Sequence, residues 1–387
     1  MAAVPVNPAL EGLGAYFTET LAPPPPGEAF DFSIGDPEEP TPPFVRQALV
    51  DAVEPVSSYP TATGRPGLRR AVADWLARRH GVEVDPDLNV LPSAGSKEAI
   101  FHTPLVVVDP GGARRHVLWG APGYPVYGRG ALLAGGMSDP IALRDAEGWR
   151  LSLSELAPER LERACLAWLN YPHNPTGATV DVDWFREQLA VARRYGILLA
   201  SDECYQELWF DEPAPSLLEA ADGDLTGLLT FVSLSKRSGM TGYRSGAIIG
   251  DPALIGRLRA LRPNLGTASP TFVQAAATAA WQDQSHVDRR REVFRAKRRV
   301  VLPFLTDAGL QVSGSAATFY VWFRAPGDDD LAYANALRAI GIVVSPGRSF
   351  GPGGEGWLRL ALVPSVDRCR RAVAVWRDAV DAGRLPG

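Results

Sequence analysis

Lys236 is the residue whose type and setting most directly suggest covalent chemistry. It lies in the segment Ser233–Gly246 (SLSKRSGMTGYRSG), after an apolar run with the composition of a buried strand. Lysine forms Schiff bases with carbonyl compounds when its surroundings lower its pKa. Arg244 follows eight residues later, and arginine and serine side chains bind phosphate. The segment therefore predicts a ligand that combines an aldehyde with a phosphate, and pyridoxal 5′-phosphate fits.

Asp202 is the second residue that points to this cofactor. It follows the apolar stretch Ile197–Ala200, so its carboxylate emerges from the core at the end of a predicted strand. A buried carboxylate needs a partner. A protein arginine would serve, and so would the pyridine nitrogen of the cofactor, which needs an acidic partner. We expect the second, because Lys236 also lies at a strand end, where ligands bind in open parallel sheets.

Two further polar segments follow predicted strands, and neither is specific alone. Gly95–Ala99 (GSKEA) opens a helical run with small residues and exposes backbone N–H groups to a phosphate or carboxylate. Ser96 in that segment could equally be an ordinary N-cap. Asn170–Gly177 (NYPHNPTG) has the composition of a tight turn. Four such segments in one chain, all at strand ends, favour one shared site over unrelated turns.

The pattern of apolar residues predicts an α/β fold. Between about residues 68 and 250, helical periodicity alternates with short apolar runs, as in a mostly parallel sheet covered on both faces. A long helical pattern follows from Gln274 to about Leu305, and then an α+β unit. We predict an N-terminal arm with part of a small domain (1–44), a large cofactor-binding domain (45–285) and a C-terminal small domain (286–387). Ala22–Gly27 (APPPPG) is typical of an extended linker.

Composition argues against several classes of protein. The chain has 387 residues and a net charge of -5, which disfavours nucleic acid or an anionic membrane as partner. Its three cysteines are odd in number and far apart, which suits a reducing cytoplasm. No signal peptide is evident and no apolar run approaches ~18 residues. The five histidines lack ligand spacing and no CxxC exists, so we expect no metal site.

In combination these segments resemble the fold-type-I pyridoxal-phosphate enzymes of the class I and II aminotransferase family. The resemblance runs from about Phe30 to Asp378. It implies an aspartate aminotransferase-like fold, with a seven-stranded, mostly parallel sheet in the large domain and a smaller α+β domain. The matching segments are Ser33–Pro37 (SIGDP), Tyr59–Leu68 (YPTATGRPGL), Gly95–Ala99, Asn174–Gly177 (NPTG), Asp202–Tyr205 (DECY), Ser233–Arg244, and Trp357–Leu362 (WLRLAL) with Arg359.

The resemblance implies roles for the residues around the cofactor ring. Lys236 would hold the cofactor as an internal aldimine and shuttle the proton, while Asp202 would pair with the ring nitrogen. Tyr205 and Asn174 would hydrogen-bond the phenolic oxygen, and Tyr124 would stack on the ring. The cofactor phosphate would lie among Gly95, Ser96, Lys97, Ser233, Ser235 and Arg244.

The resemblance also implies how substrate binds and how subunits assemble. Tyr59 is similar to the tyrosine that reaches the phosphate from the neighbouring subunit, which implies a homodimer with shared active sites. Arg359 would bind the substrate α-carboxylate with two parallel hydrogen bonds, a geometry that lysine cannot copy. Asn174 would also contact the substrate. Gly35 would lie at the substrate entrance, where a side chain would crowd the ligand.

The implied activity is a transaminase with two half-reactions, moving an amino group between glutamate and an oxo acid. Four segments (IGDPEEPTP, VLPSAGSKEAIF, SLSKRSGMTGYRSG and ATFYVWFRAP) are most similar to succinyldiaminopimelate transaminases of lysine biosynthesis, which use N-succinyl-2-amino-6-oxopimelate. The chain departs from their pattern at Gly239, where asparagine is expected, and at Ala121. An acceptor with several carboxylates needs more cations than Arg359, and the candidates are Arg65, Arg262 and Arg348.

Two other kinds of function stay open at this point. One is another aminotransferase of aspartate, alanine or aromatic type, or a pyridoxal-phosphate lyase on the same fold. The other is a ligand sensor without catalysis, although only about thirty residues precede Phe30, too few for a DNA-binding domain.

Three conspicuous features favour structural interpretations. We predict that the basic run Asp288–Arg299 (DRRREVFRAKRR) is a solvated helix face rather than a nucleic-acid surface. His173 is expected outside the chemistry, and Cys204 is expected to fill the core. Arg237, next to Lys236, receives no role.

Overall fold

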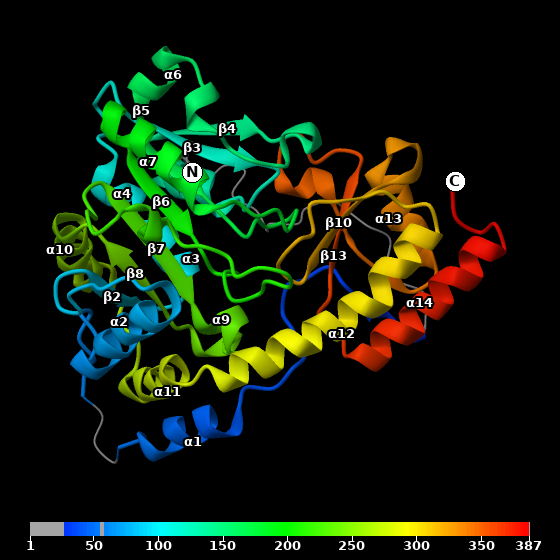
Figure 1. Ribbon diagram of the computed structural model, residues 1–387, viewed down its shortest axis with the longest axis horizontal. Helices are drawn as coiled ribbons and strands as arrows, with labels where there is room; N and C mark the ends of the chain where they lie inside the picture. Colours follow the sequence, from blue (N-terminus) through cyan, green and yellow to red (C-terminus); the bar gives the residue numbers. More distant parts are fainter. Residues whose placement is uncertain (1–26, 55–57, 387) are drawn as a thin grey trace, which may run out of the picture.

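The computed structural model describes residues 27–54 and 58–386, and its main feature is a seven-stranded sheet (Figure 1). Most of the APPPPG linker lies outside the described residues. Neighbouring strands are parallel except at β8, which runs antiparallel to β2 and β7. The prediction of an α/β fold with a mostly parallel sheet is confirmed. In spatial order the strands are β2 (Val90–Ser93), β8 (Gly246–Gly250), β7 (Leu228–Ser233), β6 (Leu198–Asp202), β5 (Ala164–Leu169), β3 (His116–Ala121) and β4 (Met137–Ala142).

Helices cover both faces of this sheet because its strands are apolar on both sides. Along β7, Leu228 and Val232 join one apolar core, while Leu229 and Phe231 join the other. This alternation follows from the two-residue period of a strand. The principal covering helices are α2 (Pro66–His80), α3 (Ser96–His102), α4 (Pro104–Val107), α5 (Val126–Leu133), α7 (Val182–Tyr195), α10 (Pro252–Leu261) and α11 (Thr271–Gln282). The shorter helices are α6 (Pro158–Arg163), α8 (Leu217–Ala220) and α9 (Leu234–Arg237).

The C-terminal third builds a second, antiparallel sheet of four strands. Its order is β12 (Ser345–Pro346), β13 (Trp357–Ala361), β10 (Tyr320–Arg324) and β9 (Val312–Ser313). Helices α13 (Asp330–Ala339) and α14 (Val366–Asp381) accompany it. Strand β1 (Phe30–Asp31) pairs in parallel with β11 (Ile342–Val343), so the start of the described chain joins this C-terminal part. The domain boundaries given above stay a prediction.

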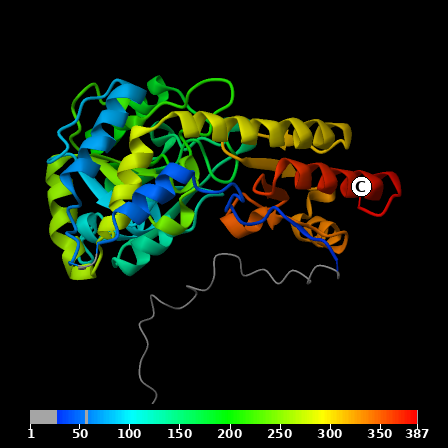
Figure 2. The same cartoon turned by 90° about the horizontal axis from the view of Figure 1, so that it is seen from below.

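Helix α12 (Ser285–Asp307) links the two parts of the molecule. Figure 2 shows it running from the large sheet outward beside α14. The sequence predicted one helix from Gln274 to Leu305. In the structure this helix is interrupted at Asp283 and Gln284, which separate α11 from α12. There the Asp283 carboxylate accepts a hydrogen bond from the His286 amide at 2.9 Å, as a helix-starting residue does.

The basic run on α12 differs from the predicted solvated face. Arg290, Arg291 and Lys297 are 7%, 7% and 0% exposed. Lys297 forms an ion pair with Glu39 at 2.5 Å, and Arg291 with Glu207 at 3.2 Å. One face of the helix is therefore a buried cationic face, which the count of charges along the sequence does not reveal.

Among the elements that the sequence did not predict are α1 (Pro43–Asp51), α5 and β4. Helix α1 packs on α11. Strand β4 reads MSDPIA, and its Asp and Pro are typical of turns. It is one of the two edge strands of the large sheet, where proline is tolerated because one side of the strand has no partner.

Candidate active site

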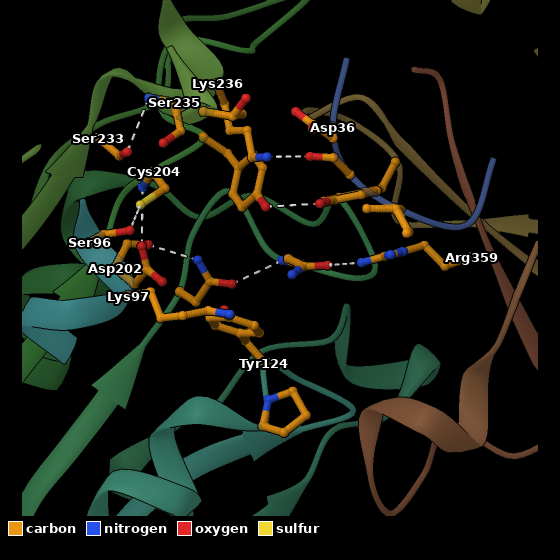
Figure 3. A pocket seen from close by; sticks show the side chains of 18 of the residues that line it. Asp36, Ser96, Lys97, Tyr124, Asp202, Cys204, Ser233, Ser235, Lys236 and Arg359 are labelled. Atoms are coloured by element: carbon orange, nitrogen blue, oxygen red, sulfur yellow. Dashed lines mark hydrogen bonds between the residues drawn. The ribbon is translucent and has the colours of Figure 1, made fainter. Parts of the chain in front are cut away.

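A cavity of about 550 Å³ lies where the carboxyl ends of β5, β6 and β7 meet residues of the C-terminal sheet (Figure 3). Asn170, Asp202 and Ser233 come from those three strand ends, while Tyr320 and Arg359 come from β10 and β13. Every residue predicted for the site lines this cavity except Gly95 and Tyr59. Residues more than 300 positions apart in the chain thus form one pocket.

Lys236 occupies one side of the cavity and Tyr124 the opposite side in the view of Figure 3. The Lys236 ammonium donates to the Gly35 carbonyl. Burial lowers the pKa of Lys236 to about 8, and the nearby Arg359 and Arg290 act in the same direction. A lysine in this state supplies a neutral amine at a pH where ordinary lysines stay charged.

Asp202 is a buried acid with only neutral partners. Its side chain accepts hydrogen bonds from the Tyr127 hydroxyl at 2.8 Å and from the Cys204 amide at 3.3 Å. Burial raises its pKa. Over residues 27–54 and 58–386, no lysine, arginine or histidine forms an ion pair with it. A cation brought by a ligand would complete this site.

Tyr127, which the sequence analysis missed, therefore belongs to the site through Asp202. It lies on α5, three residues after Tyr124, and the two rings meet edge to face with centroids 5.9 Å apart. Burial raises the pKa of Tyr127 well above its usual value, and the Asp202 carboxylate adds to this. The hydroxyl stays protonated and remains a donor. The spacing from Tyr124 was the one signal that could have indicated it.

Arg359 is connected to the turn Asn170–Gly177 by hydrogen bonds. It is 3% exposed, and one of its terminal nitrogens donates to the Asn174 side-chain oxygen at 2.9 Å. The other donates to the Ser33 carbonyl at 2.6 Å. The Asn174 amide donates to the Asn170 side chain at 3.0 Å, and Asn170 donates to the Asp202 carbonyl at 2.8 Å. The arginine and the acid are thus held in one connected frame.

The rings of Tyr320 and Phe350 further confine Arg359. Its guanidinium carbon lies 4.4 Å from the Tyr320 ring centroid and 4.5 Å from that of Phe350. The planar guanidinium is held between aromatic faces, with its nitrogens directed along fixed lines.

Tyr205 contacts a second tyrosine that the sequence analysis did not name. The two hydroxyl oxygens of Tyr205 and Tyr320 lie 2.9 Å apart. A side chain at Gly35 would place its Cβ 2.2 Å from the Tyr320 hydroxyl oxygen. Gly35 was predicted to lie at the substrate entrance, where a side chain would crowd the ligand. The structure shows that a side chain at this position would also displace Tyr320.

Arg244 lines another part of the cavity, and Gly95 lies against it. A Cβ at Gly95, whose φ is +82°, would lie 2.5 Å from a terminal nitrogen of Arg244. Arg244 also donates to the Thr241 carbonyl at 2.9 Å. The Ser233 oxygen accepts from the Ser235 amide at 3.1 Å, which leaves its hydroxyl proton available. Gly95 thus belongs beside the cavity without lining it.

Ser96, Lys97 and Tyr124 line the same region. The Ser96 oxygen accepts from the Cys204 thiol at 2.9 Å, and the Lys97 ammonium lies 5.7 Å from the Tyr124 ring centroid. Cys204 therefore borders the cavity, and it also packs against the apolar core as predicted. Burial raises the pKa of its thiol well above the usual value, so the thiol stays protonated.

Tyr59 and the three candidate arginines lie outside the cavity of their own chain. Tyr59 is 101% exposed. Arg262 is buried and pairs with Glu98 at 3.2 Å, and Arg348 pairs with Asp330 at 2.6 Å. Arg65 borders a separate groove beside α2 and α11.

His173 and Arg237 have structural surroundings. Burial lowers the pKa of His173 to about 3, so the imidazole is neutral, and it contacts the Thr176 hydroxyl at 2.8 Å. Arg237 is 2% exposed, lies 3.7 Å from Glu207 and stacks on the Trp281 ring at 4.9 Å. Both stabilise the segments that carry site residues.

The residues present fit pyridoxal phosphate. The Lys236 amine, with its lowered pKa, matches the aldehyde of that molecule. The buried Asp202 carboxylate matches its ring nitrogen, and Arg244, packed against Gly95, matches its phosphate. Over the part of the chain that the structure describes, no group of three or more His, Cys, Asp or Glu side chains could hold a metal ion.

Comparison with known proteins decides the family. The model of the family "Aminotransferase class I and II" matches residues 28–375. The chain belongs to this family. Class I and II aminotransferases use pyridoxal 5′-phosphate, so that is the cofactor of this protein.

Relatives within the class I and II aminotransferases differ in substrate. The LL-diaminopimelate aminotransferase of Desulforudis audaxviator is 39% identical over 352 residues, which covers 89% of each chain. A solved structure from Thermus thermophilus, described as a probable N-succinyldiaminopimelate aminotransferase, is 30% identical, with a TM-score of 0.84 and coverage of 91% and 95%. A mutant aspartate aminotransferase of Thermus thermophilus is 26% identical, with a TM-score of 0.82 and 91% coverage of both chains. The aspartate aminotransferase-like fold is therefore confirmed.

No helix within residues 27–54 and 58–386 is both long and apolar enough to cross a membrane.

Proposed function

We propose that this aminotransferase works in the diaminopimelate branch of lysine biosynthesis, and that it exchanges an amino group between glutamate and the oxo acid derived from LL-diaminopimelate. The observation that carries the proposal is the pairing of Lys236 and Asp202 with Arg359 in one cavity. Similarity to LL-diaminopimelate aminotransferases supports the substrate.

Pyridoxal phosphate, when bound, withdraws electrons from the substrate Cα and so makes its proton removable. Lys236 is the residue that would hold the cofactor. Its neutral amine would accept the proton from the substrate Cα. Its low pKa makes it an effective base near neutral pH.

Asp202 would pair with the ring nitrogen of the cofactor, and the hydrogen bond from Tyr127 holds the direction of that carboxylate. Tyr205, whose hydroxyl contacts that of Tyr320, and Asn174 would hydrogen-bond the phenolic oxygen of the cofactor. The residues that would hold the phosphate are Arg244, Ser233, Ser235, Ser96, Lys97 and Gly95, and Tyr124 would stack on the ring. Arg359 binds the substrate α-carboxylate, with Asn174 and Gly35 beside it.

The charges in the cavity favour free LL-diaminopimelate over its succinylated form. Lys97 would serve the phosphate through its backbone amide, so its side-chain ammonium and the Arg359 guanidinium are the two cavity cations left to match two carboxylates. The Asp36 carboxylate also lines the cavity and matches the second ammonium of a diamino acid. Succinylation would replace that ammonium with a neutral amide and add a third carboxylate. The first expectation, a succinylated acceptor, thus gives way to the free compound.

A homodimer with shared sites and a cytoplasmic location complete the proposal. The full exposure of Tyr59 supports its predicted contact with a partner subunit, because an aromatic side chain in solvent is free to be buried in an interface. The three cysteines are unpaired, as expected in a reducing compartment.

The test is a half-reaction screen with cofactor-loaded protein and no acceptor. Glutamate and LL-diaminopimelate should each convert the bound cofactor to its amine form, while N-succinyl-LL-diaminopimelate and aspartate should do so at least about tenfold more slowly. Asp36→Asn should narrow the difference between the free and the succinylated compound. Faster conversion by aspartate would instead establish an aspartate-type enzyme. Release of ammonia without formation of the amine form would establish a lyase.

A further inference from the structure

Arg290 lies behind the predicted catalytic lysine and is not part of the predicted site. It projects from α12, 54 residues from Lys236 in sequence, and its Nε donates to the Lys236 carbonyl at 3.0 Å. The side chain is 7% exposed. Its guanidinium also stacks on the Phe294 ring at 5.3 Å. A buried arginine thus reaches across from the linking helix to the main chain that carries the lysine.

The surrounding chain is built to leave room for this guanidinium. At Gly239 φ is +64°, and a Cβ there would lie 2.9 Å from Nη1 of Arg290. Thr41 donates to the Gly239 carbonyl at 2.6 Å and so holds the same loop in place. The absence of the asparagine expected at position 239 therefore gives Arg290 its space.

We propose that Arg290 is a positioning residue for Lys236: it holds the main chain that carries the lysine and adds a positive charge behind its side chain. The inference rests on the proposed role of Lys236 as cofactor anchor and base. It concerns how the lysine is tuned, and it does not depend on which amino compound reacts.

The main-chain part of the proposal follows from the shortness of α9. This helix has four residues, so the Lys236 carbonyl is at its C-terminal end, where carbonyls lack helical partners. The Ser238 amide turns back to the Leu234 carbonyl at 2.9 Å instead. The Arg290 Nε supplies the donor that Lys236 lacks, and a cation is favourable at this end of a helix.

The charge part follows from the groups that face Lys236. Asp36 and Cys204 favour its charged form, whereas Arg359 and Arg290 favour the neutral amine. Nη2 of Arg290 has no hydrogen-bond partner within the described part of the chain, so its charge is only partly compensated there. Asp36 and Glu39 are the acids that act on Arg290. Removing Arg290 should therefore make Lys236 harder to deprotonate.

The experiment is a pH titration of the visible absorbance of cofactor-loaded protein, without any amino donor. Arg290→Met should raise the midpoint by about half a pH unit or more, because one nearby positive charge is lost. Arg290→Lys keeps the charge and should shift it less. Asp36→Asn removes a negative charge and should lower the midpoint. Arg289→Gln, at an exposed position on the same helix, should leave it unchanged.

The outcomes separate a tuning role from a purely structural one. An unchanged or lowered midpoint in Arg290→Met would overturn the proposal, and so would equal shifts in Arg290→Lys and Arg290→Met. If Arg290→Met fails to load cofactor, Arg290→Gln takes its place with the same expected rise. If the variants show these shifts but the wild-type protein transfers no amino group, the proposed function is refuted and the role of Arg290 stands.

Discussion

At the residue scale, the proposed chemistry depends on two groups in one cavity: the amine of Lys236 and the Asp202 carboxylate, which forms no ion pair within the described residues. The chain contains only three lysines, at positions 97, 236 and 297. Lys297 is committed to Glu39 and to two main-chain carbonyls. Lys236 and Asp202 could be predicted from the sequence because each directly follows an apolar strand. Tyr320 could not, since its contacts depend on which elements meet in space, and for Tyr127 the sequence offered only its spacing from Tyr124.

The lowered pKa of Lys236 leads to a pH prediction. The group is charged below its pKa, so the rate at which cofactor-free protein attaches pyridoxal phosphate should rise with pH and level off above about 8. An ordinary lysine would titrate near 10.4. The attached fraction is measured after borohydride reduction. Lys236→Ala should lose that attachment, and fixation at Lys97 or Lys297 instead would contradict the assignment.

The hydrogen bond from Tyr127 to Asp202 leads to a second prediction. Tyr127→Phe removes the only side-chain hydroxyl that donates to the Asp202 carboxylate among the described residues. A hydrogen bond to a charged group contributes about 1.5–3 kcal/mol, so kcat/KM should fall by roughly 10- to 100-fold. Steady-state kinetics at saturating cofactor measures this. Tyr195→Phe on α7 serves as the control, and an equal loss in that variant would show a general effect on folding.

At the element scale, α12 does more than connect two sheets. Its buried face carries Arg290, Arg291 and Lys297, and each contacts a different segment of the chain. The sequence indicated a helix here, because periodicity is local. Which basic residues are buried depends on the acids that other segments bring, and no local pattern contains that information.

Lys297 provides the stability prediction for this helix. Lys297→Met leaves Glu39 without its ion-pair partner, and the second Glu39 carboxylate oxygen already has no hydrogen-bond partner within the described residues. The free energy of unfolding should fall by about 3 kcal/mol. Urea unfolding followed by circular dichroism measures it. Arg299→Gln, on the exposed face, should change it by less than about 0.5 kcal/mol, and similar losses in both variants would argue against a special role for the buried face.

At the scale of the whole molecule, the fold class could be predicted because strands and helices alternate along the chain. The contribution of β1 to the C-terminal part could not, because it joins Phe30 to Ile342. The proposed role of the exposed Tyr59 likewise depends on a second subunit, which no local sequence pattern describes.

Mixing variants tests the shared site. Lys236→Ala and Tyr59→Ala homodimers should each be strongly impaired at low cofactor concentration. After subunit exchange, half of the dimers are mixed, and each contains one intact site if Tyr59 acts across the interface. About a quarter of wild-type activity should then return. No recovery, although exchange is shown by mass spectrometry, would place Tyr59 with its own subunit.

We expect the cavity around Lys236, Asp202 and Arg359 to be where amino groups are transferred. The most direct measurement is a single turnover of cofactor-loaded protein with glutamate in the absence of any oxo acid. We expect one 2-oxoglutarate per active site, loss of the visible cofactor absorbance, and its return when 2-oxoglutarate is added. Continuous release of ammonia, or an unchanged spectrum with both glutamate and LL-diaminopimelate, would contradict it.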